Sequence, residues 1–177
     1  MRFNLRELSL TVVFAVLYAV AVISLAPISF GVWQVRVADA LLPLSIVFGT
    51  PCTVGLSLGC IIGNIYGGLG PIDVICGPIA NFIACFAAHK IGRRNGVIAR
   101  FLGSFTETII ISVIVGGYLS YLFNVPLELS MIGVLIGSII AINAIGFPLE
   151  EIMRRVYIQY TKQGLSYRFK NKQKEGI

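Results

Sequence analysis

The sequence predicts an all-α integral membrane protein, a bundle of six transmembrane helices forming a single membrane domain over residues 1–177. Hydrophobic residues make up 56% of the chain and charged residues only 12%, whereas roughly a quarter of the residues of a soluble protein are charged. Apolar runs recur along the chain, separated by Gly and Pro residues. A chain of this length has room for about six helices of roughly 20 residues, so we expect no appended catalytic domain.

Six apolar segments are expected in chain order. The first follows a basic N-terminus, as a secretory signal does, but its apolar run is long and further spans follow, so we expect it to be retained as a span. The second is short and is followed at once by Gly49-Thr50-Pro51. The second and third segments therefore form a tight hairpin, and whether the second crosses the membrane fully stays open. The segments are about 9–28, 38–49, 51–67, 72–91, 97–123 and 127–153, followed by a basic cytoplasmic tail at 154–177.

Lys and Arg residues are distributed unevenly about these segments. If both termini are cytoplasmic, every one of the fourteen except Arg36 falls on the cytoplasmic side, as the positive-inside rule requires. This orientation in the cell membrane places Arg36, Asp39, Asp73 and Glu128 near the outer face. The basic residues that give the net charge of +6 then lie where they meet anionic lipid headgroups. No nucleic-acid partner is therefore expected.

Several kinds of chemistry are not supported by the sequence. The single histidine, His89, lies beside Lys90 at the end of a span, so neither an HExxH motif nor a histidine-ligated catalytic metal is expected. The four cysteines lie in apolar segments without a CxxC pair and are interpreted as core residues. No P-loop is present, so we expect no ATP hydrolysis by this chain. The alternative is an aspartyl-type enzyme that uses Asp39 and Asp73 as a carboxylate pair. It is disfavoured because both residues lie at the mouth of their segments. We therefore predict neither an enzyme nor a cofactor or metal site.

The remaining polar residues suit binding. Three of them lie in or just after the loop that follows the first span, and Asp73 follows the Gly-rich turn at 67–71 on the same side. Asn64 and Glu107 lie within spans, where they must face the interior. An aromatic face with carboxylates and amides fits a small planar heterocycle that stacks and hydrogen-bonds along its edge. The candidate residues are Trp33, Arg36, Asp39, Asn64, Asp73 and Glu107.

Each candidate also has a purely structural interpretation. Trp33 fits an interfacial aromatic belt. Arg36 and Asp39 are three residues apart and fit a surface ion pair. Asn64 fits a hydrogen bond between helices or a helix C-cap. Glu107 is the hardest to interpret in this way, because it lies well inside a span with no cation near it in the sequence.

Small residues recur at helical spacing in three segments, the last through Gly133 and Gly137. The pattern favours close helix packing for the third segment. A similar pair, Ala15 and Ala19, lies on the first segment, and such a face suits either a neighbour within the chain or a separate membrane subunit. The stripe on the third segment consists of Gly55, Gly59, Gly63 and Gly67.

Two sequence runs carry a family resemblance. QVRVADALLPLSIVFG, followed by GLSLGCIIGNIYGGLGPIDVICG, resembles the signature of the QueT-like family, the queuosine-precursor substrate-binding (S) components of energy-coupling factor (ECF) transporters. The likeness is close over 34–90 and looser over the rest of the chain. It departs from the family pattern at Thr106-Glu107 and Gly137-Ser138, where an Asn and a Gly-Glu pair are expected.

The resemblance implies a six-helix bundle that binds a small molecule on its outer side. It also implies a transmembrane coupling subunit and two cytoplasmic ATPase subunits as partners, with Ala15 and Ala19 matching the AxxxA motif that often meets the coupling subunit. For a deazaguanine ligand, Glu107 or Asp73 would accept from the donor edge.

In the same scheme, Arg36 or Asn64 would serve the ligand carbonyl, and Trp33 would stack on the ring or cover it. The alternatives are an S component for another vitamin-like heterocycle, a non-transporting membrane scaffold subunit, and an ion-coupled carrier. The last is disfavoured because no inverted repeat is visible.

Overall fold

A computed structural model describes residues 4–29, 36–94 and 96–174, and over these residues it is helical with short connecting turns and contains no strand. This confirms the all-α class. Each of the six expected segments coincides with helical structure, and the last helix continues past the expected boundary at 153. The elements are α1 (Leu5–Ser24), α2 (Ala26–Ser29), η1 (Val37–Leu41), α3 (Leu44–Phe48), α4 (Thr50–Gly67), α5 (Pro71–Gly92), α6 (Val97–Phe123), α7 (Leu127–Ser138), the π-helical η2 (Ile139–Gly146) and α8 (Phe147–Lys174).

Four helical stretches within the described residues are long and apolar enough to cross a membrane. They are Leu5–Ser24, Pro71–Gly92, Val97–Phe123 and Leu127–Thr161. Large apolar side chains on their outer faces are exposed, among them Val16, Ile79 and Ile109. Such all-round apolar helices are typical of membrane spans, in which lipid covers the outer face. The chain is therefore a multi-pass membrane protein.

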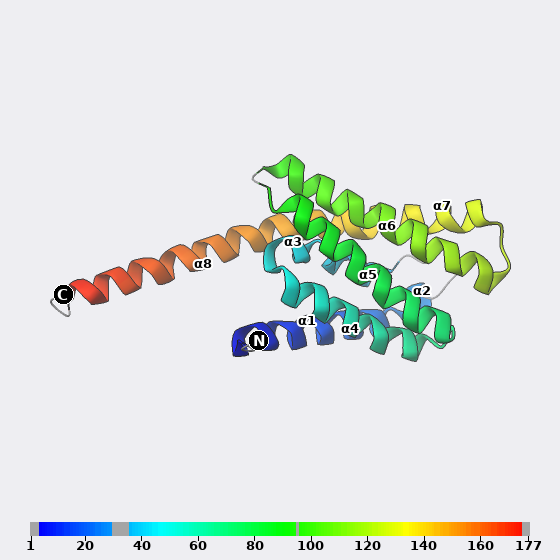
Figure 1. Cartoon of the computed structure of the whole chain (residues 1–177), viewed down its shortest axis with the longest axis horizontal. Coiled ribbons are helices and arrows are strands. Elements are labelled where there is room, and N and C mark those ends of the chain that lie inside the picture. The colour runs from blue at the N-terminus through cyan, green and yellow to red at the C-terminus, as the bar shows by residue number, and fades with distance from the viewer. Residues whose placement is uncertain (1–3, 30–35, 95, 175–177) are drawn as a thin grey trace.

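The helices lie side by side in an antiparallel bundle (Figure 1). α1 packs on α4, α4 on α5, α5 on α6, and α6 on α7. Both termini lie at one end of the bundle, at the left of Figure 1, and the α4–α5 and α6–α7 turns lie at the other end. α8 projects well beyond the bundle at the terminal end. This arrangement agrees with an even number of passes and with termini on one side of the membrane.

The short segment 37–48 is enclosed by the other helices. Its η1 half packs against α1 and η2, and its α3 half packs against α4, α5 and α8. Most of its side chains are buried, including Leu42 at 0% exposure. Non-helical or short helical backbone is tolerated at membrane depth where protein surrounds it. This explains how a segment too short to cross a bilayer alone occupies the middle of the bundle.

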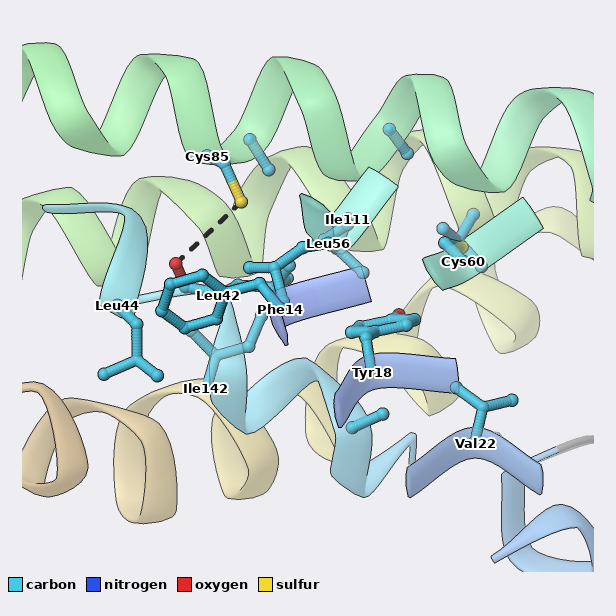
Figure 2. Packing of buried hydrophobic residues seen from close by; sticks show 14 of the residues in the cluster. Phe14, Tyr18, Val22, Leu42, Leu44, Leu56, Cys60, Cys85, Ile111 and Ile142 are labelled. Atoms are coloured by element: carbon cyan, nitrogen blue, oxygen red, sulfur yellow. Dashed lines mark hydrogen bonds between the residues drawn. The ribbon is translucent and has the colours of Figure 1, made fainter. Parts of the chain in front are cut away.

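Figure 2 shows the apolar core that holds this segment in place. Leu42 and Leu44 pack among side chains from α1, α4, α5, α6 and η2. The thiol of Cys85 donates to the Leu42 carbonyl oxygen at 3.8 Å. Three of the four cysteines, Cys52, Cys60 and Cys85, are fully buried in this core. They serve as small packing residues there, as the sequence suggested.

The glycine stripe of α4 permits backbone contact with α1. A Cβ atom at Gly55 would lie 2.5 Å from the Thr11 carbonyl oxygen, and one at Gly63 would lie 2.8 Å from a methyl group of Val22. At Gly59 a Cβ would overlap the Ala15 carbonyl oxygen and lie 2.9 Å from the Tyr18 Cβ. The expectation that this stripe packs a helix is therefore confirmed for Gly55, Gly59 and Gly63.

The turn between α4 and α5 needs glycine for a different reason. Gly68 and Gly70 have φ angles of +70° and +110° and no atom within 4 Å of a Cβ built on them. Only glycine adopts such angles without strain. Gly68 ends α4 in the left-handed conformation, and Pro71 begins α5, as is common at helix C- and N-termini. The turn brings the end of α4 beside the first turn of α5.

Candidate ligand-binding site

A buried group of polar side chains lies where α1, η1, α4, α5 and α6 meet. We call it the Arg36 cluster. Three of its residues are charged, two are tyrosines, and they come from regions far apart in the sequence. Its members are Tyr18, Arg36, Asp39, Cys60, Asn64, Asp73 and Tyr118.

Arg36 lies at the start of η1 and is only 4% exposed. Its Nη2 lies 3.8 Å from Oδ1 of Asp73, and its Nη1 donates to the Cys60 sulfur at 3.7 Å. Asp39 also attracts it electrostatically. Arg36 and Asp39 are both buried, at 4% exposure each, which excludes the interpretation of a solvent-exposed surface pair.

Asp39 is held from α1. The hydroxyl of Tyr18 donates to Asp39 Oδ1 at 2.5 Å, and both side chains are buried. A hydrogen bond to a carboxylate is among the stronger kinds in proteins. It ties η1 to the middle of the first helix.

Asp73 lies in the first turn of α5 and is fully buried. The hydroxyl of Tyr118 donates to its Oδ1 at 2.7 Å. The other oxygen, Oδ2, accepts no hydrogen bond from the described residues. A buried carboxylate oxygen without a donor is costly, so this atom is well suited to a ligand.

Asn64 lies next to Asp73 across the α4–α5 turn. Its Nδ2 donates to the Asp73 backbone carbonyl at 2.8 Å, which is the hydrogen bond between helices that the sequence allowed. Its Oδ1, also fully buried, accepts no hydrogen bond from the described residues. Gly77, one turn further along α5, leaves the space that Asn64 uses, because a Cβ there would overlap Nδ2 and lie 3.6 Å from the Tyr118 hydroxyl.

Glu107 bonds to Ser45 rather than to a member of this cluster, although the Asp39 carboxyl acts on it electrostatically. It is fully buried on α6, its Oε1 accepts from the Ser45 hydroxyl at 3.2 Å, and its Oε2 accepts no hydrogen bond from the described residues. Tyr118 follows eleven residues later on the same helix, which corresponds to about 16 Å along the axis. That distance exceeds the length of a single bicyclic heterocycle. The structure therefore does not bring Glu107 together with Asp73.

A second set of polar contacts lies near Glu107. Thr108 donates to Asn143 Oδ1 at 2.6 Å, and Asn143 Nδ2 donates to the Ser104 hydroxyl at 3.3 Å. Asn143 lies in the π-helical η2, and a Cβ at Gly146 in the same element would lie 2.6 Å from the Ala40 carbonyl oxygen. These contacts join α6, η2 and η1.

An ion-pair network closes the terminal end of the bundle. Arg100 Nη2 lies 2.5 Å from Glu151 Oε1, and its Nε lies 3.6 Å from the fully buried Glu150. Arg154 lies 3.2 Å from the other oxygen of Glu151. These contacts fasten α8 to α6 at the end opposite the α4–α5 turn.

The remaining predicted residues have different outcomes. Trp33 lies in 30–35, outside the described residues. Ala19 is 6% exposed and Ala15 is half-buried, with its backbone against Gly55 and Gly59 of α4. Part of this small-residue face is therefore used within the chain.

Sequence reasoning missed Tyr18 and Tyr118. Each is a tyrosine inside an apolar segment, and a buried tyrosine hydroxyl usually has a partner. That rule could have marked both tyrosines as residues with a buried hydrogen-bond partner. It could not supply the partners, because these lie 21 and 45 residues away in the sequence. Among the described residues, no group of three His, Cys, Asp or Glu side chains is placed to hold a metal ion.

An antiparallel bundle with apolar outer helices defines a multi-pass membrane protein, and the buried polar cluster is its candidate binding site. Comparison of the sequence with protein families identifies the family to which this membrane protein belongs. The family model described as QueT transporter matches residues 8–155, so this chain belongs to the QueT transporter family, as the resemblance suggested. Membership makes it a transporter protein rather than a member of an enzyme family. Neither the curated proteins nor the solved structures contain a match.

Proposed function

We propose that this chain is the substrate-binding S component of an ATP-driven ECF importer in the cytoplasmic membrane, and that it binds a queuosine precursor, a deazaguanine, at the Arg36 cluster. The observation that carries the proposal is the burial of Arg36, Asp39 and Asp73 together in a chain with few charges. Ionisable side chains inside a membrane protein are costly and generally functional. Membership of the QueT transporter family supports the transport role.

The open hydrogen-bonding atoms of the cluster suit the edge of a deazaguanine. Its amino and ring N–H groups are adjacent donors, and Asp73 Oδ2 and Asn64 Oδ1 are buried acceptors without donors among the described residues. Its carbonyl needs a donor, which Arg36 supplies. Trp33 is proposed to stack on the ring or cover it, as an aromatic residue close in sequence to Arg36.

Asp39 and Glu107 have separate roles in this proposal. Asp39 orients the guanidinium of Arg36. Glu107, about 16 Å from Tyr118 along α6, acts as a positioning residue that holds α3 through Ser45. Direct binding by Glu107 suits a different cargo, another vitamin-like heterocycle. The departure from the family pattern at Thr106-Glu107 is the observation that favours this second candidate.

The partners proposed are an ECF transmembrane coupling subunit and two cytoplasmic ATPase subunits. The first helix is the proposed docking element. Ala15 and Ala19, which match the AxxxA motif, pack toward α4, so the docking surface proposed is the exposed face beside them. Val12, Val16 and Val20 are each about half exposed on α1, at 53%, 54% and 55%. Co-purification of tagged full-length chain with ATPase subunits is expected, and a non-transporting scaffold predicts their absence.

The binding role is tested by measuring deazaguanine affinity for the purified full chain and four variants. Arg36→Ala and Asp73→Asn are expected to weaken binding at least tenfold, as loss of a hydrogen bond to a charged group does. Glu107→Gln keeps the acceptor for Ser45 and is expected to change affinity less than threefold. Glu128→Gln, an exposed carboxyl in the first turn of α7, is the matched control.

Mass spectrometry of small molecules that survive purification identifies the cargo independently. Unchanged affinity in folded Arg36→Ala and Asp73→Asn proteins would remove the Arg36 cluster from the binding site. A large loss in Glu107→Gln alone would favour the second candidate.

A further inference from the structure

The last helix, α8, continues well past the end of the bundle. Inside the bundle it packs on α3, η1, α6 and η2. The Tyr157 ring packs edge-on against Phe48 of α3, with 5.7 Å between the ring centroids, and Tyr160, about one turn further, is 71% exposed. The rest of α8, as far as Lys174, projects beyond the terminal end of the bundle at the left of Figure 1. The surroundings of this part of the helix therefore come from outside the bundle.

The projecting part of α8 is rich in positive charge. Residues 154–174 contain no Asp or Glu, yet they contain half of the fourteen Lys and Arg residues of the chain. Lys and Arg side chains are ionised in water at neutral pH, so this stretch is strongly cationic. Its basic residues are Arg154, Arg155, Lys162, Arg168, Lys170, Lys172 and Lys174.

The nearest carboxyl groups along α8 are already engaged. Glu150 and Glu151 precede the basic stretch, and both lie within ion-pair distance of Arg100 on α6. Further along, Arg168 and Lys172 are four residues apart, a spacing at which like charges destabilise a helix. An anionic partner from outside the chain would remove this repulsion and stabilise the helical form.

The position of the stretch indicates which anionic surface is the partner. The apolar stretch Leu127–Thr161 is long enough to cross a membrane, and the basic residues occupy its end and continue past it. Clusters of Lys and Arg directly beside a transmembrane helix are attracted to anionic phospholipids. Tyr167 and Phe169 are interleaved with the basic residues, and aromatic side chains are favoured at the level of the headgroups. Charge and composition therefore both fit a lipid surface.

The length of the helix determines how it must lie to reach that surface. A straight continuation would carry Lys174 about 20 Å past Thr161, whereas the field of the headgroups decays over about 8 Å at physiological ionic strength. The end of α8 must therefore lie along the membrane to feel this field. Gly164 is the only glycine in α8, and glycine has a lower helix propensity than any residue except proline. The helix is consequently easiest to bend just before its most basic part.

We propose that residues 165–174, the basic arm, bind the anionic phospholipid headgroups of the leaflet from which α8 emerges. This contact does not depend on the cargo of the Arg36 cluster and goes beyond the proposed transport role. A nucleic acid would also neutralise the arm. The leaflet is favoured because the arm is tethered to it by the preceding span, which gives a high effective concentration.

The test places a fluorescent label on the arm of the full chain in lipid nanodiscs. Ser166→Cys, in a Cys76→Ser background, is labelled with a thiol-reactive fluorophore, and its quenching by acrylamide is measured. One disc contains phosphatidylcholine alone, and the other contains about one third phosphatidylglycerol, which is anionic. The quenching constant is expected to be at least about twofold lower in the anionic disc, and to recover in about 1 M salt, where the Debye length is about 3 Å.

Variants assign the protection to the charge of the arm. Replacing its four basic residues by Gln, which has a similar helix propensity, is expected to abolish the difference between the two discs. The triple change to Arg at 170, 172 and 174 keeps the charge, so the difference is expected to persist. The matched control replaces four exposed basic residues at the same end of the bundle by Gln and is also expected to keep it. These are Arg6, Lys90, Arg93 and Arg94.

A label at Asn124→Cys, in the exposed α6–α7 turn far from the arm, controls for effects of the lipid on the fluorophore, and circular dichroism establishes that each variant is folded. Equal quenching of the Ser166→Cys label in the two discs would overturn the proposal. So would protection that survives in about 1 M salt or in the folded Gln variant. Protection by an RNA oligonucleotide in neutral discs, without protection by phosphatidylglycerol, would replace the lipid by a nucleic acid.

Discussion

At the scale of single residues, the Arg36 cluster depends on contacts that cross the whole bundle. Arg36, Asp39, Asn64 and Asp73 could be selected from the sequence because polar residues in apolar company are conspicuous. The structure adds what sequence alone cannot supply, namely that Tyr18 and Tyr118 each donate to one of the carboxylates. Those pairings are tertiary, so no local pattern encodes them. The sequence indicates that Glu107 lies well inside its span, but it does not show that Asp73 pairs with Tyr118, about 16 Å further along the same helix.

Tyr18→Phe tests the contribution of one such pairing. The change removes the donor to Asp39 and leaves a buried carboxylate oxygen short of a hydrogen bond, which costs about 1–3 kcal/mol. Thermal unfolding in detergent is expected to show a lower midpoint. Tyr66→Phe is the matched control, because Tyr66 is 62% exposed at the end of α4. An equal midpoint for both variants would contradict the assignment.

At the scale of helices, glycine spacing and turn residues predicted the helix boundaries better than hydropathy did. The expected boundaries of 51–67, 72–91 and 97–123 lie within one residue of α4, α5 and α6. The expected end at 153 was placed where polar residues begin, but α8 continues to Lys174, because Arg, Lys and Gln are good helix formers in water. The π-helical η2 had no sequence signal, and the close approach of its Gly146 to the Ala40 backbone is a tertiary contact that no local pattern encodes.

Gly59→Val tests whether the packing of α1 on α4 depends on the absence of side chains. The added atoms would overlap the Ala15 backbone, and overpacking of this kind costs about 1–3 kcal/mol. A lower unfolding midpoint in detergent is expected. Gly117→Val on α6 is the control, because nothing lies within 4 Å of a Cβ at that position. If the Gly59 variant is no less stable than the Gly117 variant, close packing is not the reason for the stripe.

At the scale of the whole molecule, the sequence predicted the bundle and its antiparallel order because charge asymmetry and apolar length are global properties. The enclosure of segment 37–48 was not predictable in the same way. Its short length left open whether it crosses the membrane, and only the surrounding helices show why a short segment suffices. The side of the membrane on which the termini lie remains a prediction.

Cysteine labelling in intact cells tests that orientation. We expect Asn124→Cys, in the exposed α6–α7 turn, to react with a membrane-impermeant maleimide added outside, and Arg94→Cys to react only after permeabilisation. Both positions are exposed, so access and not burial decides the result. The wild-type chain, in which Cys76 is partly exposed and the other three cysteines are buried, gives the background. The reverse pattern of labelling would invert the topology and place the Arg36 cluster toward the cytoplasm.

The glycine stripe of α4 has a mechanical consequence. Glycines have no rotamers to immobilise, and a contact made by backbone atoms leaves little slack for one helix to slide over the other. α1 and α4 should therefore move as one rigid body. Since Tyr18 is carried by α1 and Asn64 by α4, a force applied to the lipid-facing side of the first helix reaches two members of the Arg36 cluster simultaneously. A partner that pulls on that helix would thus change the shape of the site without touching a ligand.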